Sequence, residues 1–444
     1  MKKRLLALLL ALSSVFALAT GCGERKKEPK DVDYAASVKL DMNSETLKQE
    51  VEVKLYIDGD TTHFFVPTNV SADGVLKARY LAVNTPESTG KIEEWGKKAS
   101  KFTKEKLMSA TSIILETDGT KWEKDSTGDR HLVWVWYKPE GATDYRNLNI
   151  EILQNGLAFA SNSGGNRYGE TCLDAIAQAT KNALHIHSKE KDPDFFYGSA
   201  IEMDLKELRL NVAEYDGMKV AFEGVVTYLY NNGAYIENYD EETGIWYGMY
   251  VYYGFTLSPD GQEIVFPGNK VRIVGTVSYY EAGDSYQVSG LQYSPFDIGD
   301  PNNIQNLDPE NDYAPVHLLT SAADFTRTVE IHLEDEETAR SYKYPEVALH
   351  SSISMKGLKV KSIYTTNNGG SNDGAMTITC ELDGKEIVVR TDVLRDENGD
   401  VVTASKYLNK TIDVKGVIDY FKAEGQEKGG HQIKVFDVTD ITVH

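Results

Sequence analysis

Residues 78–87 read ARYLAVNTPE and place Arg79 in an apolar stretch, eight residues before Glu87. Ahead of them, VEVKLYI (51–57) and HFFVP (63–67) are rich in residues that favour strands and flank the turn Asp58-Gly59-Asp60. Two such runs joined by a glycine-centred turn predict a β-hairpin, and the apolar run that contains Arg79 predicts a third strand. Proline fixes the backbone after Thr85, so the chain should leave this strand through a rigid turn.

Further elements follow this turn. Apolar residues at helical spacing predict an amphipathic helix over Gly96–Met108. Two more strands are expected over 112–116 and 132–137, and two more helices over 148–155 and 171–184. The first domain is therefore predicted to combine five strands with three helices.

Three kinds of side chain in this domain fit one chemistry. A carboxylate held at a rigid turn, Glu87, is suited to take a proton from an attacking water. The guanidinium groups of Arg79 and Arg130 match the oxygens of a phosphate better than an ammonium group does. Acidic oxygens such as those of Asp60 suit a hard cation. Hydrolysis of a phosphodiester requires these parts together.

In this order and spacing, residues 51–187 resemble the staphylococcal nuclease (thermonuclease) family. The resemblance implies an oligonucleotide/oligosaccharide-binding (OB) barrel of five strands with three helices over 46–200. It also implies endonucleolytic cleavage of DNA to 3′-phosphate products, with RNA as an open alternative substrate. The roles implied are a general base at Glu87, phosphate binding by Arg79 and Arg130, and calcium ligands at Asp60, Asn84 and the Thr85 carbonyl.

The chain departs from the family pattern in three places. Asn84 stands where the family carries an aspartate, so we expect weaker calcium binding that Asn84→Asp would tighten. The loop Asp125–Arg130 has one residue more than the family turn and lacks its tyrosine. Residues 156–163 lack the tyrosines that cover the nucleotide in the family, so contacts to the base must differ. His185 and His187 more often mark a helix end than a metal pair.

Two later stretches resemble each other and predict two further barrels. Residues 268–288 and 409–435 each hold a strand with a central glycine (Gly275, Gly416), a second strand and a hairpin. Glycine within a strand marks the bends that small barrels need. We therefore expect a mainly β chain, with an α+β first domain, a tether over 23–45, OB-like barrels over 201–300 and 326–444, and a linker over 301–325.

The charge of the chain is unfavourable for nucleic-acid binding. The formal net charge is −21, and acidic runs such as 237–242 lie in the C-terminal half. The lysines of 97–106 would place any basic surface on the first domain. Tyrosines between 228 and 253 could stack on single strands, but the neighbouring acid favours half-buried strand surfaces instead.

The N-terminus has the pattern of an exported lipoprotein. A basic start, an apolar run over 5–18 and the end Ala19-Thr20-Gly21-Cys22 predict a signal peptide over 1–22, with lipid attached to Cys22. The alternative is an ordinary signal peptide with an incidental cysteine. The other two cysteines, Cys172 and Cys380, show no metal-thiolate spacing, and a disulfide between them stays open.

The sequence thus predicts a lipid-anchored, calcium-assisted endonuclease on the extracellular face of a Gram-positive type membrane. Nucleic acid and the membrane are its expected partners, and no protein partner is evident. Two other classes remain open. One is a catalytically weakened nucleic-acid-binding protein, and the other is an adhesion or glycan-binding surface protein built of OB-like modules.

Overall fold

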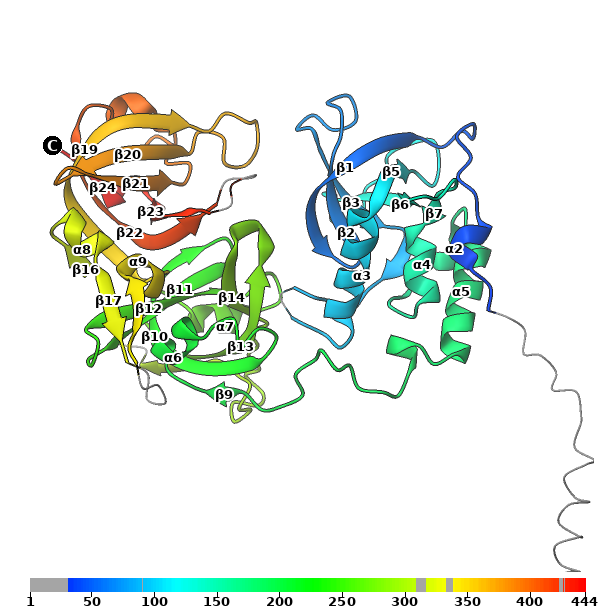
Figure 1. Ribbon diagram of the computed structural model, residues 1–444, viewed down its shortest axis with the longest axis horizontal. Coiled ribbons are helices and arrows are strands. Elements are labelled where there is room, and N and C mark those ends of the chain that lie inside the picture. The colour runs from blue at the N-terminus through cyan, green and yellow to red at the C-terminus, as the bar shows by residue number, and fades with distance from the viewer. Residues whose placement is uncertain (1–30, 90, 309–316, 333–337, 423–425, 427) are drawn as a thin grey trace, which may run out of the picture.

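Five strands in the N-terminal part of the chain close into the first barrel (Figure 1) in the computed structural model, which describes residues 31–89, 91–308, 317–332, 338–422, 426 and 428–444. Its strands are β1 (Lys48–Asp58), β2 (Thr61–Phe65), β3 (Val75–Tyr80), β5 (Ala110–Glu116) and β6 (His131–Pro139). They pair in the order β3-β2-β1-β5-β6, and the parallel pair β3–β6 closes the barrel. Burial alternates along β3, which turns Leu76, Ala78 and Tyr80 inward and leaves Arg79 outside.

Three helices accompany this barrel. They are α3 (Gly96–Met108), α4 (Leu148–Gln154) and α5 (Gly169–Lys181). The helix α3 has the predicted bounds because Ala99, Thr103 and Leu107 repeat at helical spacing and are buried. Two short strands, β4 (Ala82–Asn84) and β8 (Phe159–Ser161), pair beside the barrel. The first of them, β4, leads directly into the Thr85 turn.

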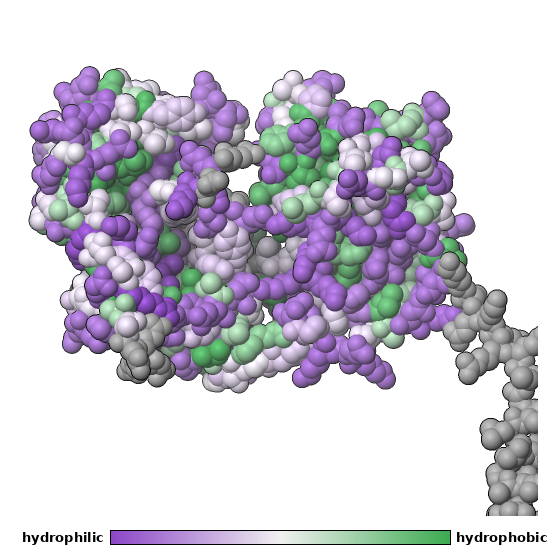
Figure 2. Space-filling model, in the orientation of Figure 1, coloured by the Kyte–Doolittle hydropathy of each residue, from purple (hydrophilic) through white to green (hydrophobic). Residues whose placement is uncertain are grey.

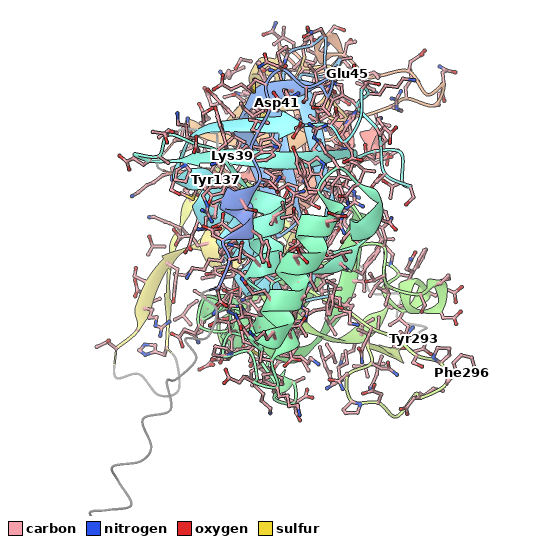
Figure 3. All side chains as sticks on the ribbon, turned by 90° about the vertical axis from the view of Figure 1, so that its right-hand side faces the viewer. Lys39, Asp41, Glu45, Tyr137, Tyr293 and Phe296 are labelled. Carbon is pink, nitrogen blue, oxygen red and sulfur yellow. The ribbon has the colours of Figure 1, made fainter. Side chains whose placement is uncertain are left out.

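The residues before β1 lie on the first barrel. A short helix, α2 (Tyr34–Ser37), buries Ala35, and Val32 donates its N–H to Gln178 Oε1 at 2.9 Å. Figure 3 shows Lys39, Asp41 and Glu45 beside the same barrel. The predicted signal peptide and Cys22 lie outside the described residues. Within the part that is described, no helix has both the length and the apolar character needed to cross a membrane.

The second barrel repeats the connectivity of the first. Its strands are β10 (Lys219–Tyr230), β11 (Gly233–Asp240), β12 (Ile245–Tyr252), β13 (Lys270–Tyr280) and β14 (Ser285–Ser289). The pair β12–β14 is parallel, and β10 closes the barrel on β13. A helix, α7 (Pro259–Ile264), joins the third and fourth strands, and α6 (Leu205–Leu210) precedes the barrel.

The third barrel has the same order again. It contains β19 (Ser352–Thr365), β20 (Met376–Leu382), β21 (Lys385–Thr391), β22 (Thr411–Phe421) and β23 (Gly430–Val435). The parallel pair is β21–β23, and β19 closes the barrel on β22. A Cβ on Gly275 of β13 would lie 2.6 Å from Val288, and one on Gly416 of β22 would lie 2.0 Å from the Lys434 carbonyl. These two glycines therefore let the fourth and fifth strands approach closely, and the prediction of three mainly β barrels is confirmed.

Smaller elements connect the second and third barrels. The strand β15 (Gln305–Asp308) pairs with β13 of the second barrel, and β16 (His317–Leu319) pairs with β19 of the third. Residues 320–351 add α8 (Ala322–Thr326), the hairpin β17 (Thr328–Ile331) and β18 (Arg340–Lys343), and α9 (Tyr344–Val347). The remaining short strands are β7 (Arg146–Asn147), β9 (Ile201–Glu202) and β24 (Ile441–Val443).

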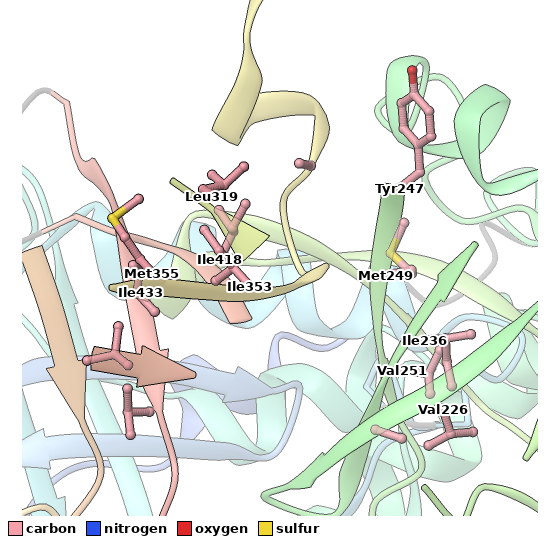
Figure 4. Close-up of a cluster of buried hydrophobic side chains, with 14 of the residues drawn as sticks. Val226, Ile236, Tyr247, Met249, Val251, Leu319, Ile353, Met355, Ile418 and Ile433 are labelled. Atoms are coloured by element: carbon pink, nitrogen blue, oxygen red, sulfur yellow. The ribbon is translucent and has the colours of Figure 1, made fainter. Parts of the chain in front are cut away.

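The three barrels are joined in two different ways. One continuous apolar core runs through the second and third barrels, and Figure 4 shows part of it from Val226 to Ile433. The first barrel has a core of its own. Its contact with the second barrel is polar: Lys97 of α3 pairs with Asp216 at 3.3 Å, and Lys104 pairs with Glu281 at 2.7 Å. Hydrophilic residues also cover most of the face shown in Figure 2.

Candidate active site

The turn between β1 and β2 buries two carboxylates. Asp60 is 1% exposed, and its Oδ2 accepts the Thr85 N–H at 2.9 Å while Oδ1 accepts the Thr61 hydroxyl at 3.0 Å and an N–H of Arg79. A Cβ on Gly59 would lie 2.8 Å from the Thr85 side chain. Only glycine lets this turn approach the Thr85 turn so closely, which brings the two predicted loops together.

Arg79 joins the parts of this site. It lies on β3, next to Thr61 of β2 on one side and Leu132 of β6 on the other. Its Nη1 bonds to Asp60, and its Nη2 donates to Asn84 Oδ1 at 2.6 Å. The side chain is 18% exposed. A guanidinium group has five N–H donors, so these two contacts leave others for an external anion.

Glu87 is exposed at the end of the Thr85-Pro86 turn. Its carbonyl accepts the Glu93 N–H at 2.9 Å, and its own N–H donates to Glu93 Oε2 at 3.3 Å. The next residue, Ser88, donates its hydroxyl to Asp58 Oδ1 at 2.7 Å. Both peptide groups of Glu87 are therefore held, and its exposed side chain shares a hydrogen bond with the Asp58 carboxyl group.

Asp58 adds a third carboxylate to this corner. Burial raises the pKa of Asp58 to about 8, the Ser88 hydrogen bond opposes the rise, and the carboxylates of Asp60 and Glu87 add to it. Asp58 Oδ1 also accepts the Gly59 N–H at 2.7 Å. The structure therefore places Asp58 between the two loops of the site.

Arg130 lies apart from this group. Its Nε donates to Asp125 Oδ2 at 2.7 Å, and its Nη2 lies 2.7 Å from the same oxygen. The additional residue of this loop, Asp129, pairs with Lys77 at 2.8 Å. Leu132, two residues after Arg130, is the neighbour of Arg79 across the sheet. The structure thus brings Arg130 to the adjoining loop, where Asp125 holds its guanidinium.

The oxygen atoms near Arg79 suit a hard cation. Asp60 and Asn84 direct oxygens at the same guanidinium, so both face one positively charged group. Thr85 Oγ1 is buried without a hydrogen-bond partner in the part of the chain described. Carboxylate, amide and hydroxyl oxygens are ligands that calcium accepts, although Asn84 adds no charge. No cluster of three or more His, Cys, Asp or Glu side chains with metal-binding geometry occurs among the described residues.

A cavity of about 520 Å³ adjoins Arg79. Its walls include Asp118, Leu132 and the small polar residues of 161–166. Asn162 has a left-handed backbone with φ of 51°, followed by Ser163, Gly164 and Gly165. Where the family has tyrosines, this chain therefore offers hydrogen-bonding groups on a short loop. The size of the cavity is in the range of sites for small ligands.

Two other candidate features have structural uses. Several lysines of α3 pair with acids: besides the two that contact the second barrel, Lys106 pairs with Glu151 at 3.1 Å. These pairs leave fewer lysines free for a basic surface on the first domain. His185 approaches the Asn155 carbonyl through Nδ1 at 2.7 Å and contacts the Trp95 ring, which agrees with the expectation that the two histidines mark a helix end.

Comparison with known proteins supports the assignment of the first barrel. The family model for staphylococcal nuclease homologues matches residues 77–189 of the 444 in the chain. No curated protein matches the chain. The match includes Arg79, Asn84, Glu87 and Arg130, and begins after Asp60. Residues 77–189 therefore form a staphylococcal-nuclease-like domain, which points to nuclease function and is accompanied by two further β-barrels.

Proposed function

We propose that the protein is a calcium-assisted nuclease that hydrolyses phosphodiester bonds of DNA. The observation that carries the proposal is the set of contacts that Arg79 makes. This guanidinium contacts both Asp60 and Asn84, lies beside the turn that presents Glu87, and lines a cavity large enough for one nucleoside. RNA is a second candidate substrate, because the resemblance to the nuclease family leaves the choice between DNA and RNA open.

Each side chain of the site has its own role in the proposed reaction. Glu87 takes a proton from water, whose oxygen bonds to phosphorus as the bond to the 5′ oxygen breaks. The departing oxygen takes a proton from solvent, which leaves a 3′-phosphate and a 5′-hydroxyl. Arg79 neutralises the charge that grows on the phosphate oxygens, and Arg130 joins it once released from Asp125. Asp60, Asn84 and Thr85 would hold a calcium ion, which would add positive charge next to the phosphate.

We also propose that lipid on Cys22 anchors the protein to the extracellular face of the membrane. Val32 and Asp33 already bond to the first barrel, through Gln178 and Arg146 respectively. Val32 and Asp33 of the 23–45 segment expected as a tether therefore lie on the barrel. Eight residues lie between Cys22 and Asp31, and a fully extended chain of this length spans at most about 30 Å.

Two observations favour a second function. Asn84 lowers the charge of the cation site and Asp125 occupies Arg130, so a protein that binds DNA with little turnover fits these two residues. The exposed carboxylate of Glu87 favours the enzyme, because binding alone does not need an acidic group beside the phosphate site.

The test is cleavage of circular single- and double-stranded DNA by the chain from residue 23 onward. Calcium is titrated against a chelator, and Glu87→Gln is the control. We expect calcium-dependent nicking that Glu87→Gln lowers by about 10²- to 10⁴-fold, the usual contribution of a general base. Retention of DNA on a gel without cleavage at millimolar calcium would favour the binding protein. Equal cleavage by the Glu87→Gln variant would remove Glu87 from its role.

A further inference from the structure

The segment that leaves the first barrel returns to the loop of Glu87. Asp192, in this segment, is 2% exposed, and its Oδ2 accepts the Trp95 N–H at 2.6 Å. Its Oδ1 accepts the Asp194 N–H at 3.0 Å, and its own N–H donates to the Tyr197 hydroxyl oxygen at 2.9 Å. Tyr197 in turn donates to Glu94. Two carboxylates and a phenol therefore join residues 192–197 to residues 94–95.

Trp95 needs this support. Its φ of 68° lies in the left-handed region, which is uncommon for a residue with a large side chain. It is the residue before α3, and its own side chain makes no capping hydrogen bond there. The hydrogen bond that its N–H donates to Asp192 and the edge contact with His185, with ring centres 5.0 Å apart, hold it in place.

Gly96, the residue after Trp95, packs against the loop that contains Glu87, the proposed general base. A Cβ on Gly96 would lie 2.1 Å from the Glu87 carbonyl oxygen, so the Glu87 backbone rests directly on Gly96. Gly96 also donates its N–H to the Glu93 carbonyl at 3.0 Å, and Glu93 holds both peptide groups of Glu87. A shift of residues 95 and 96 would therefore move Glu87.

We propose that Asp192 is a positioning residue for Glu87, and that the segment leading to the second barrel is part of the active-site scaffold. The proposal rests on the nuclease function proposed above. The second barrel reaches the same corner from the other side, because Asp216 pairs with Lys97, the residue after Gly96. The placement of the second barrel and the alignment of the general base are thereby coupled.

The experiment compares Asp192→Ala with Asp192→Asn in the chain from residue 23 onward. Alanine removes the acceptor for the Trp95 N–H, and we expect kcat to fall about ten- to a hundredfold with KM unchanged, as for a small misplacement of a catalytic group. Asparagine keeps one oxygen for the Trp95 N–H and loses only the bond from the Asp194 N–H, so its kcat should fall clearly less than that of the alanine variant. Asp174→Ala, an exposed aspartate on α5, is the matched control and should change neither constant.

Amide hydrogen exchange over residues 85–96 is measured on the same proteins and does not depend on activity. Faster exchange in Asp192→Ala together with the kcat loss supports the proposal. Unchanged kcat in Asp192→Ala, or an equal loss in Asp192→Asn, overturns it. If Asp192→Ala does not fold, Tyr197→Phe replaces it, with an expected loss of about two- to fivefold. A parent protein without nuclease activity would overturn the proposed function, while unchanged exchange in Asp192→Ala would overturn the scaffold role by itself.

Discussion

The first and second barrels share one connectivity and use the same face in opposite ways. In OB barrels the second and third strands form the face that binds ligands. In the first barrel these strands are β2 and β3, and the face presents Arg79 next to an open cavity. In the second barrel they are β11 and β12, and the third barrel covers them. A shared topology therefore does not imply a shared function, because what decides is whether this face is free.

Aromatic rings of the third barrel, and of the strand β16 that precedes it, contact aromatic residues of the second barrel. Phe436 lies 5.2 Å from Tyr228 and 5.6 Å from Tyr235, measured between ring centres. His317 stacks on Trp246 with ring centres 4.2 Å apart. Tyr228 and Tyr235, two of the tyrosines that could have formed a stacking platform for single strands, thus contact the third barrel instead.

Polar groups make this contact specific. Glu237 is fully buried, and its carboxylate accepts the Ser352 N–H at 2.5 Å and the Ser352 hydroxyl at 3.0 Å, with His317 Nε2 at 3.3 Å. A Cβ on Gly248 would lie 2.3 Å from the His350 carbonyl carbon, so the two backbones meet directly. Buried charges are retained only where such partners satisfy them, so the two barrels should behave as one unit.

Of the changes that test this comparison, we expect the largest from Glu237→Ala, which should lower the stability of the contact between the second and third barrels. The substitution removes the buried carboxylate that accepts two hydrogen bonds from Ser352, and we expect a loss of about 2–3 kcal/mol in the free energy of unfolding of the C-terminal unit. Urea unfolding measures the loss. Glu386→Ala, an exposed acid on β21, is the control and should change stability by no more than about 0.5 kcal/mol. An equally small effect of Glu237→Ala would mean that the carboxylate does not hold the barrels together.

A smaller effect is expected from Asn84→Asp in the first barrel. A second carboxylate next to Asp60 adds charge to the cation site, and charge count sets calcium affinity, so half-maximal activation should need about tenfold less calcium. The measurement is a calcium titration of nuclease activity, with isothermal titration calorimetry as a check. Unchanged calcium dependence would show that the ion does not contact residue 84.

Much of the first barrel could be predicted from sequence because its signals are local. The spacing of apolar residues gave the bounds of α3, and the order of Asp60, Arg79 and Thr85 indicated that they would meet. Arg130 could not be placed, because the pairing with Asp125 depends on the conformation of one additional residue. The match to the family model supports the domain and leaves the roles of these residues as predictions.

Contacts between distant segments could not be predicted. Asp192 lies 97 residues from Trp95, and no motif marks the pair. Glu237 belongs to an acidic run, yet it is buried because the third barrel covers it. A sequence shows the charge of a strand but not which surface will lie on it.

The smallest effect is expected at His350. Protonation of this residue should make the stability of the C-terminal unit depend on pH. Burial lowers the pKa of His350 well below 6.5, and the charges of Arg209 on α6 and Lys434 on β23 act in the same direction. Tyr235 of β11 and Tyr250 of β12 complete its surroundings. Its ring is therefore neutral in the folded protein, where Nδ1 accepts the Tyr250 N–H at 3.1 Å.

The sign of the effect follows from proton binding. Below pH 6.5 the unfolded chain binds a proton at His350 that the folded chain does not, so the stability contributed by this group is present above pH 6.5 and is lost as the pH falls. Urea unfolding of the C-terminal unit between pH 7.5 and 5 should show this loss. His350→Gln keeps an acceptor without a titrating ring and should flatten the slope. Equal slopes in both proteins would mean that other groups cause the pH dependence, and that His350 only fills space between the barrels.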